Sequence, residues 1–307
     1  MIGDNSGAQK PTIMWGYLVR RFEQLIANLA ITDKQLQDGL TGQAGVRSTL
    51  NLHYWAANSE TANSRLIGSW GKQLRVRPPR DVDVLFTLPW EVYYRFEQRT
   101  GNKQSQLLQE VRAVLAQDYP QTTMRGDGQV VVVAFSTMPV EVVPAFAFDD
   151  GQFWICDTKD GGSYRLTDPQ AELAALEVSD LATGGATRIL IRILKQWQRH
   201  CDVPLKSFQL ERLAVEFLMT WSHPKDLYWI DWMLRDFFTY LLARQNTVLV
   251  MPGTFHQVPL GDAWASKART AETTANNAFY FEKDNEDVAA GIAWQSLFGA
   301  MIPMWVS

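Results

Sequence analysis

The sequence is poor in features that mark several classes of protein. Its only two cysteines, Cys156 and Cys201, have no CxxC spacing and no neighbouring histidines, which disfavours both a disulfide framework and a structural zinc site. No run of about 18 apolar residues occurs, which excludes a transmembrane helix. The N-terminal segment MIGDNSGAQKPT lacks the basic and apolar regions of a signal peptide. We therefore expect a reduced, cytoplasmic protein with no membrane partner.

The chain also lacks a net positive charge and a cluster of histidines. A net charge of -4 disfavours a non-specific nucleic-acid binder, although a local basic pocket stays compatible with it. The four histidines are scattered without metal-ligand spacing, and no Ser-His-Asp or Cys-His arrangement suggests nucleophilic catalysis. With 46% hydrophobic residues in 307, the chain can form one large or two modest domains.

Apolar periodicity predicts an α+β fold. Helices are expected over residues 15–29, 45–63 and 103–118, strands over 81–86, 129–135, 140–146 and 153–157, and helices alone beyond about residue 165, near 186–200, 208–221, 226–244, 262–278 and 286–298. Asp168-Pro169 opens the helical half, and Gly299 is placed to stop its last helix. The sequence thus predicts a sheet domain over residues 1–165, with a long N-terminal helix, and a helical domain over 166–307.

Two aspartates stand on one predicted strand. In RDVDVLF, Asp81 and Asp83 are two residues apart, so their side chains point to the same face. Carboxylates this close repel each other unless water surrounds them or a cation lies between them. Mg²⁺ prefers oxygen ligands of this kind. The pair indicates either a divalent metal site or an ordinary solvent-facing strand.

A Gly-Ser pair precedes these aspartates. Gly68 and Ser69 stand where a predicted helix ends and the sheet begins, and the backbone amides and hydroxyl of such a turn can hold a phosphate. Four cations lie between this pair and Asp81: Lys72, Arg75, Arg77 and Arg80. Cations and a phosphate-binding turn next to carboxylates that can hold a metal ion would together form a site for a metal-bound phosphate. The simpler alternative is that Gly68-Ser69 is an ordinary turn and the cations belong to a solvated basic loop.

A third carboxylate interrupts the apolar strand VEVVPAF. Glu141 is costly in such a strand unless it is exposed or paired. If the predicted hairpin lies beside the Asp81 strand, Glu141 completes an acidic triad that can hold two metal ions for phosphoryl or nucleotidyl transfer.

Together these residues resemble the signature of the polymerase-β-like nucleotidyltransferase superfamily: a Gly-Ser pair, DVD on a strand, and one acidic residue on a later strand. The chain is similar to the bacterial cGAS/DncV-like nucleotidyltransferases (CD-NTases) of anti-phage CBASS systems. The resemblance covers the leading helix, RPPRDVDVLF, VEVVPAF, RILKQWQRHCDVPLKSFQLERL and the terminal helices ending in AWQSLFG. Many relatives have Asp at the position of Glu141. The resemblance implies a bilobed fold with a cleft between the lobes.

The resemblance also assigns roles in the helical half. It places Lys195 and Ser207 at the triphosphate of the bound nucleotide, with Gly68 and Ser69. A stripe of cations recurs at helical spacing through this segment: Arg188, Arg192, Lys195 and Arg199. A solvated helix face explains the same pattern, and Ser207 also fits a helix N-cap.

The activity implied by the resemblance is the joining of ribonucleoside triphosphates, ATP and GTP foremost, into a cyclic oligonucleotide second messenger. A purine-containing cyclic dinucleotide of the cGAMP type is the favoured product. Asp81, Asp83 and Glu141 would hold two Mg²⁺ or Mn²⁺ ions. A product-sensing effector protein would act in trans, and no DNA activation is expected because no Cys/His cluster matches a zinc insertion. The alternatives are an RNA, protein or small-molecule acceptor, or a non-catalytic nucleotide-binding module.

Overall fold

The computed structural model describes residues 16–306, which form two compact units. The sheet unit comprises residues 31–178 and 250–257, and the helical unit comprises the described residues up to 30, residues 179–249 and those from 258 onward. The α+β class is confirmed, while a catalytic domain ending at residue 165 stays a prediction. Within residues 16–306 no helix is long and apolar enough to span a membrane. The N-terminal segment assessed for a signal peptide, and the predicted helix start at residue 15, lie outside the described residues.

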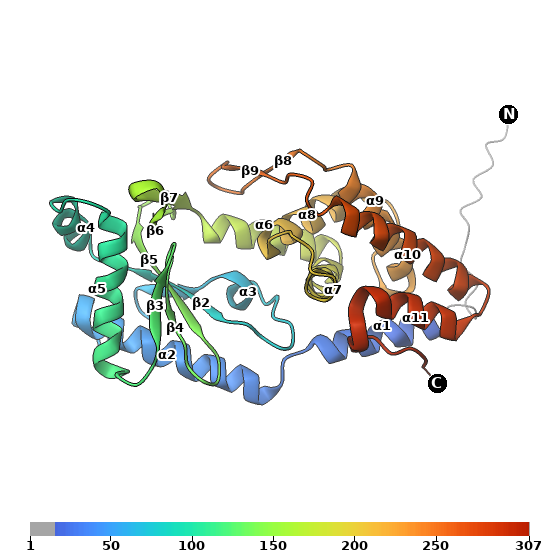
Figure 1. Ribbon diagram of the computed structural model, residues 1–307, viewed down its shortest axis with the longest axis horizontal. Helices are drawn as coiled ribbons and strands as arrows, with labels where there is room; N and C mark the ends of the chain where they lie inside the picture. The colour runs from blue at the N-terminus through green and yellow to red at the C-terminus, as the bar shows by residue number, and fades with distance from the viewer. Residues whose placement is uncertain (1–15, 307) are drawn as a thin grey trace. The chain divides into compact units, whose positions relative to one another are not determined.

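One mixed sheet forms the centre of the sheet unit (Figure 1). Its strands are β1 (Ser64–Leu66), β2 (Val82–Thr87), β3 (Met124–Asp127), β4 (Val130–Val133), β5 (Val140–Ala147), β6 (Phe153–Asp157) and β7 (Ser163–Thr167). The order is β1-β2-β5-β4-β3, with β6 pairing to β5 and β7. β2 and β5 run parallel, and β4 and β5 form the predicted antiparallel hairpin.

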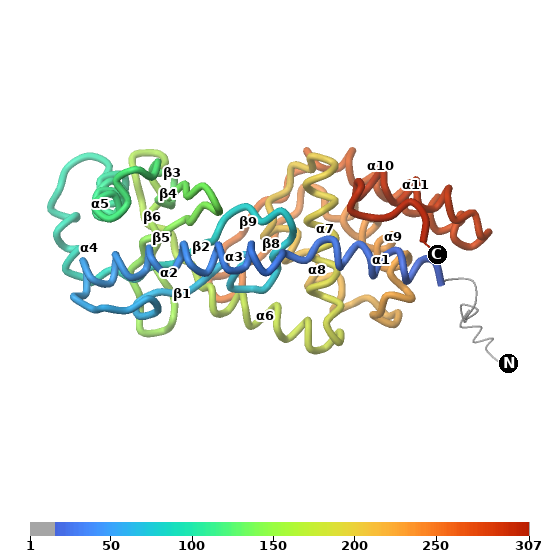
Figure 2. Tube along the Cα trace, turned by 90° about the horizontal axis from the view of Figure 1, so that it is seen from below, coloured from blue at the N-terminus to red at the C-terminus, as the bar shows by residue number. Residues whose placement is uncertain are grey.

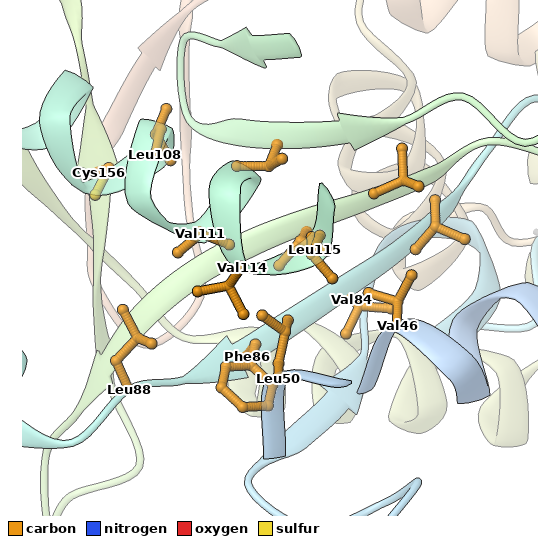
Figure 3. Packing of buried hydrophobic residues seen from close by; sticks show 14 of the residues in the cluster. Val46, Leu50, Val84, Phe86, Leu88, Leu108, Val111, Val114, Leu115 and Cys156 are labelled. Atoms are coloured by element: carbon orange, nitrogen blue, oxygen red, sulfur yellow. The ribbon is translucent and has the colours of Figure 1, made fainter. Parts of the chain in front are cut away.

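The two faces of the sheet differ in what covers them. Val82, Val84 and Phe86 are buried in the main hydrophobic core, together with residues of α2 (Asp33–Trp55) and α5 (Lys103–Asp118) (Figure 3). Leu85, on the opposite face of β2, joins a smaller cluster with Ala145 and Phe153. The alternation predicted for this strand is therefore confirmed, and α5 has the predicted bounds.

The second predicted helix was misplaced. It spans Asp33–Trp55 rather than residues 45–63. The Thr32 hydroxyl accepts a hydrogen bond from the Gln35 amide at 3.2 Å, and the Gln35 side chain accepts one from the Thr32 amide at 3.0 Å. These reciprocal bonds are a capping box, which fixes the start of the helix. The helix ends at Ala56, whose φ of 49° is left-handed.

Several short elements escaped prediction. They are β1, β3, β7, α3 (Gly68–Gly71), α4 (Trp90–Glu97) and the hairpin of β8 (Val248–Val250) and β9 (Gln257–Pro259). The expectation of no strands beyond residue 165 was wrong, because β7 ends at Thr167 and β8 pairs with β9. Strands of three to five residues with exposed positions carry too few apolar side chains to show a period of two.

Helices build the second unit. They are α1 (Gly16–Leu29), α7 (Ala186–His200), α8 (Ser207–Thr220), α9 (Ile230–Leu242), α10 (Ala265–Lys283) and α11 (Asp287–Phe298). α6 (Pro169–Ala182) runs from the sheet unit into this one, and the Asp168 carboxylate accepts from the Ala171 amide at 2.8 Å, capping its start. The expected stop at Gly299 is confirmed by its φ of 66°.

A buried ion cluster joins the first helix of this unit to the last two. Arg21 on α1 is fully buried and donates to the Glu282 carboxylate on α10, at 3.4 Å, and to Asp287 on α11. The Trp294 indole also donates to Glu282, at 3.3 Å. α10 and α11 lie side by side (Figure 2). Buried charges of this kind are tolerated because each has a partner.

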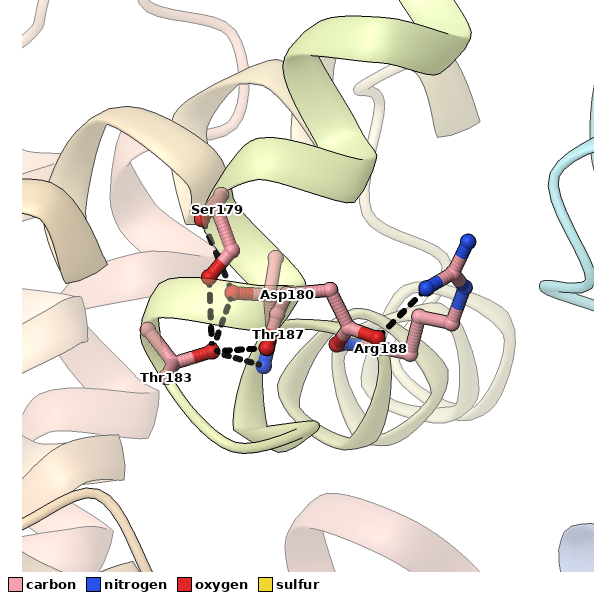
Figure 4. A network of polar contacts seen from close by, with 5 residues as sticks. All are labelled: Ser179, Asp180, Thr183, Thr187 and Arg188. Carbon is pink, nitrogen blue, oxygen red and sulfur yellow. Dashed lines mark hydrogen bonds and ion pairs between the residues drawn. The ribbon is translucent and has the colours of Figure 1, made fainter.

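A second polar cluster fixes the turn between α6 and α7 (Figure 4). The Ser179 and Thr187 hydroxyls lie 2.8 Å apart, and the Thr183 hydroxyl lies 2.9 Å from that of Thr187. Ser179 and Thr187 are fully buried. Asp180 forms an ion pair with Arg188 beside them. The hydroxyls satisfy one another, so this buried polar turn needs no water.

Candidate active site

The three candidate carboxylates of the sheet unit lie on or next to the paired strands β2 and β5. Asp83 on β2 is the register partner of Glu141 on β5, and partners in adjacent strands share a face of the sheet. Asp81 immediately precedes β2, where the Val82 amide donates to the Pro139 carbonyl at 2.9 Å. The acidic triad was predicted on the condition that the hairpin lies beside the Asp81 strand, and the structure meets this condition.

The electrostatics of this pairing act on Glu141. Burial raises the pKa of the Glu141 carboxyl above its ordinary value, and the charges of Asp81 and Asp127 raise it further, while Arg125 opposes them. Arg125 on β3 occupies the same row of the sheet as Glu141, because Val132 is the register partner of both. The site thus concentrates negative charge in a half-buried position, which a bound cation would relieve.

Gly68 lies directly against the acidic strand. Its φ is 55°, a left-handed conformation, and a Cβ at this position would fall 2.1 Å from the Asp83 Oδ2 atom. The Ile67 amide donates to the Asp83 carbonyl at 3.0 Å. The Gly-Ser pair opens α3 instead of ending a helix, a correction to the sequence prediction. Glycine is required here both for φ and for space.

The residues present suit a divalent cation in their chemistry. Asp81, Asp83 and Glu141 offer hard carboxylate oxygens, the ligands that Mg²⁺ prefers. In the described part of the chain, however, no three acidic, histidine or cysteine side chains are grouped closely enough to hold a metal ion. The metal roles of these carboxylates therefore stay predictions.

The cations of the basic loop over residues 72–80 are not all solvated. Lys72 forms an ion pair with Glu172 on α6 at 2.8 Å. The Arg75 guanidinium lies over the Trp70 ring, 4.9 Å from its centroid, and burial lowers its pKa. Arg80 is exposed. Lys72 and Arg75 thus have specific contacts that anchor the loop.

Lys195 and Ser207 belong to the helical unit. Lys195 on α7 is buried, and its Nζ atom lies 2.8 Å from the Glu211 Oε1 atom on α8. Ser207 is the first residue of α8, after the N-cap Lys206, so the predicted capping role of Ser207 is wrong. The cation stripe of α7 is not a solvated face either, because none of its four members is exposed.

Two ion pairs of candidate residues, one in each unit, left no signal in the sequence. Glu211 and Glu172 are each ion-paired to a candidate cation, Lys195 and Lys72 respectively. Lys72 and Glu172 are 100 residues apart, so no local spacing could reveal their pairing. Glu211 lies one helical turn after Ser207, a spacing that places both on one face of α8.

The chain is similar to one family of proteins in sequence and to several solved structures in fold. A model described as the Second Messenger Oligonucleotide or Dinucleotide Synthetase domain, SMODS, matches residues 17–179. No curated protein matches the chain in sequence.

Three solved structures illustrate the similarity in fold. E. coli CdnC in a complex with HORMA-deltaN has a TM-score of 0.69 at 17% identity, over 93% of this chain and 97% of that one. Vibrio cholerae DncV, a cyclic AMP-GMP synthase bound to the linear intermediate pppA(3',5')pG, has 0.63 at 14%, over 93% and 86%. Bradyrhizobium diazoefficiens CdnG, a CD-NTase in complex with GTP, has 0.63 at 13%, over 92% and 95%. The resemblance stated from the sequence is confirmed.

Proposed function

The chain belongs to the SMODS family of second messenger oligonucleotide or dinucleotide synthetases, and we propose that it joins ribonucleoside triphosphates into a cyclic oligonucleotide. The observation that carries the proposal is the register pairing of Asp83 with Glu141, with Gly68 packed against Asp83. An acidic pair with an adjoining Gly-Ser turn suits a nucleotide triphosphate and its metal.

In this reaction a ribose hydroxyl of the acceptor nucleotide attacks the α-phosphate of the donor. The new phosphodiester P–O bond forms as the bond to the β-phosphate breaks, pyrophosphate leaves, and the hydroxyl proton passes to solvent. A second attack of the same kind, by the free hydroxyl of the linear intermediate on its own triphosphate end, closes the ring. Positioning and charge neutralisation supply most of the catalysis in such chemistry.

The roles proposed for the residues are those that the family resemblance implies. Gly68 and Ser69 would hold the donor triphosphate, with Lys195 and Ser207 as further contacts. Asp81, Asp83 and Glu141 would hold two Mg²⁺ ions, which when bound neutralise phosphate charge and lower the pKa of the attacking hydroxyl. We propose ATP and GTP as substrates and a cyclic dinucleotide of the cGAMP type as the product, sensed by an effector protein in trans.

The test is product formation by the purified chain. It is incubated with Mg²⁺ and all four ribonucleoside triphosphates, treated with phosphatase, and analysed by mass spectrometry. We expect a phosphatase-resistant product whose mass gives its bases and ring size, and none from Asp81→Asn/Asp83→Asn. Asp149→Asn/Asp150→Asn, which neutralises two exposed carboxylates outside the site, is the matched control.

Two results would redirect the proposal. Transfer of a labelled nucleotide to an added RNA, protein or small molecule, without a cyclic product, would favour a different acceptor. Equal product from the wild type and the Asp81→Asn/Asp83→Asn variant would remove these residues from catalysis.

A further inference from the structure

The strongest unassigned feature is the buried ion pair between α7 and α8. The Lys195 and Glu211 side chains are only 7% and 10% exposed, with 2.8 Å between Nζ and Oε1. A lysine removed from water to this degree needs an anion beside it, because desolvation disfavours an uncompensated charge. Glu211 supplies that anion within the helical unit itself.

A hydrogen bond between the same two helices lies one turn away. The Ser207 hydroxyl donates to the Gln198 Oε1 atom at 3.3 Å. Gln198 follows Lys195 by three residues on α7, and Glu211 follows Ser207 by four on α8, so each pair shares one face of its helix. Both residues expected at the triphosphate are therefore held by a partner on the opposite helix.

This arrangement affects how the lysine can bind a phosphate. An unrestrained lysine loses much rotamer freedom when it is fixed in a complex. An ammonium has three hydrogen-bond donors, so contact with a carboxylate and contact with a phosphate oxygen are compatible. A lysine already oriented by a carboxylate meets the phosphate with less entropy to lose.

We propose that Glu211 is a positioning residue for nucleotide binding. It compensates the charge of Lys195 and orients its ammonium before the nucleotide arrives, and it acts on the triphosphate only through Lys195. This inference rests on the proposed function, in which Lys195 contacts the donor triphosphate.

The test is a double-mutant cycle in which the dissociation constant (Kd) of a nucleotide analogue is measured for each variant. The probe is α,β-methylene ATP with Mg²⁺, which cannot release pyrophosphate, titrated into the full chain by calorimetry. Glu211→Gln keeps a hydrogen-bond acceptor but removes the charge, and we expect it to raise Kd about tenfold. Lys195→Met should raise Kd by at least as much. The double variant Lys195→Met/Glu211→Gln should bind no more weakly than Lys195→Met alone, because Glu211 then has nothing to position.

Two further variants separate positioning from a general loss of stability. Glu216→Gln removes a carboxylate of the same helix that pairs with Arg212 and Arg244, at 3.1 and 2.9 Å, and should leave Kd unchanged. Glu211→Asp keeps the charge with a shorter reach and should raise Kd only two- to threefold. If Glu211→Gln fails to fold, the aspartate variant and the double variant, which contains no unpaired buried charge, still decide the question.

The outcomes are distinguishable. Unchanged or tighter binding by a folded Glu211→Gln, or additive losses in the double variant, would overturn the inference while leaving the proposed function intact. Unchanged binding by Lys195→Met would instead remove Lys195 from the proposed triphosphate site.

Discussion

Glu141 on β5 stands opposite Asp83 on β2, in the register of a parallel strand pair. The two carboxylates therefore share one face of the sheet, although 58 residues separate them in the sequence. Because β2 and β5 are held together by main-chain hydrogen bonds, the ladder fixes the backbone positions of this pair. The same strand pairing holds Glu141 near Asp81, whose charge raises the pKa of the Glu141 carboxyl.

Replacing Glu141 by Gln should separate activity from stability. Burial and the charge of Asp81 already raise the pKa of this carboxyl, so a neutral side chain relieves repulsion and should raise Tm by about 2 °C. Product formation should fall at least about 100-fold. Calorimetry and the mass-spectrometric assay measure the two effects, and a fall in both would indicate a structural role instead.

Gly68→Ala should reduce activity more than the strain of a left-handed alanine alone would. The added Cβ would fall 2.1 Å from the Asp83 Oδ2 atom, so the acidic strand or the turn must move. We expect a loss of activity of about 100-fold, because small displacements of reacting groups cost this much. Gly128→Ala is the matched control, since its φ of 61° is similar and nothing lies within 4 Å of the added Cβ. Equal activities of the two variants would contradict the expectation.

The buried Glu282 should make stability depend on pH. Burial raises its pKa from 4.5 to about 7. Between these values the folded protein retains a proton that the unfolded chain has lost, so the contribution to the free energy of unfolding falls as pH rises, by up to about 3 kcal/mol.

Urea unfolding at pH 5 and pH 7.5 measures this effect. Glu282→Gln, which is neutral at both values, should lose less stability than the wild type on going to pH 7.5. The exposed Glu177→Gln is the control and should behave as the wild type does. A wild type and a Glu282→Gln variant with the same pH slope would refute the assignment.

The two thiols should differ in reactivity. Cys156 is fully buried, and burial raises its pKa to about 12, whereas Cys201 is half-buried. Because the thiolate is the reactive form, iodoacetamide at pH 7.5 should modify Cys201 slowly and Cys156 only after unfolding. Peptide mapping after native and denatured labelling gives the two rates, and early labelling of Cys156 would show that this part of the core opens.

The sequence predicted the site where local pattern and chemistry coincide. The regular alternation around Asp83 placed its side chain away from the core, and the isolated charge of Glu141 interrupted an otherwise apolar strand, so both acidic residues could be identified as candidates. The left-handed turn at Gly68 could not be predicted, since its need for glycine arises from a contact with another strand. The Lys195–Glu211 pair was equally hidden, because it depends on how α7 packs on α8.

The fold elements differ in the same way: those with a clear local pattern were predicted, and those without one were missed. Long amphipathic helices such as α5 were predicted because each buries one continuous stripe. The start of α2 was missed, although Thr32 and Gln35 already match a capping box. Edge strands such as β3, with three of its four residues exposed, show no apolar alternation at all.

The ion cluster of Arg21 makes the first helix of the helical unit depend on its last two for charge compensation. Its partners Glu282 and Asp287 lie 261 and 266 residues later in the chain. During synthesis α1 leaves the ribosome before the strands of the sheet unit, yet it finds its counter-charges only when α10 and α11 follow. Contacts this distant slow folding, so the sheet unit has time to form while α1, with the apolar Phe22, still awaits its partners.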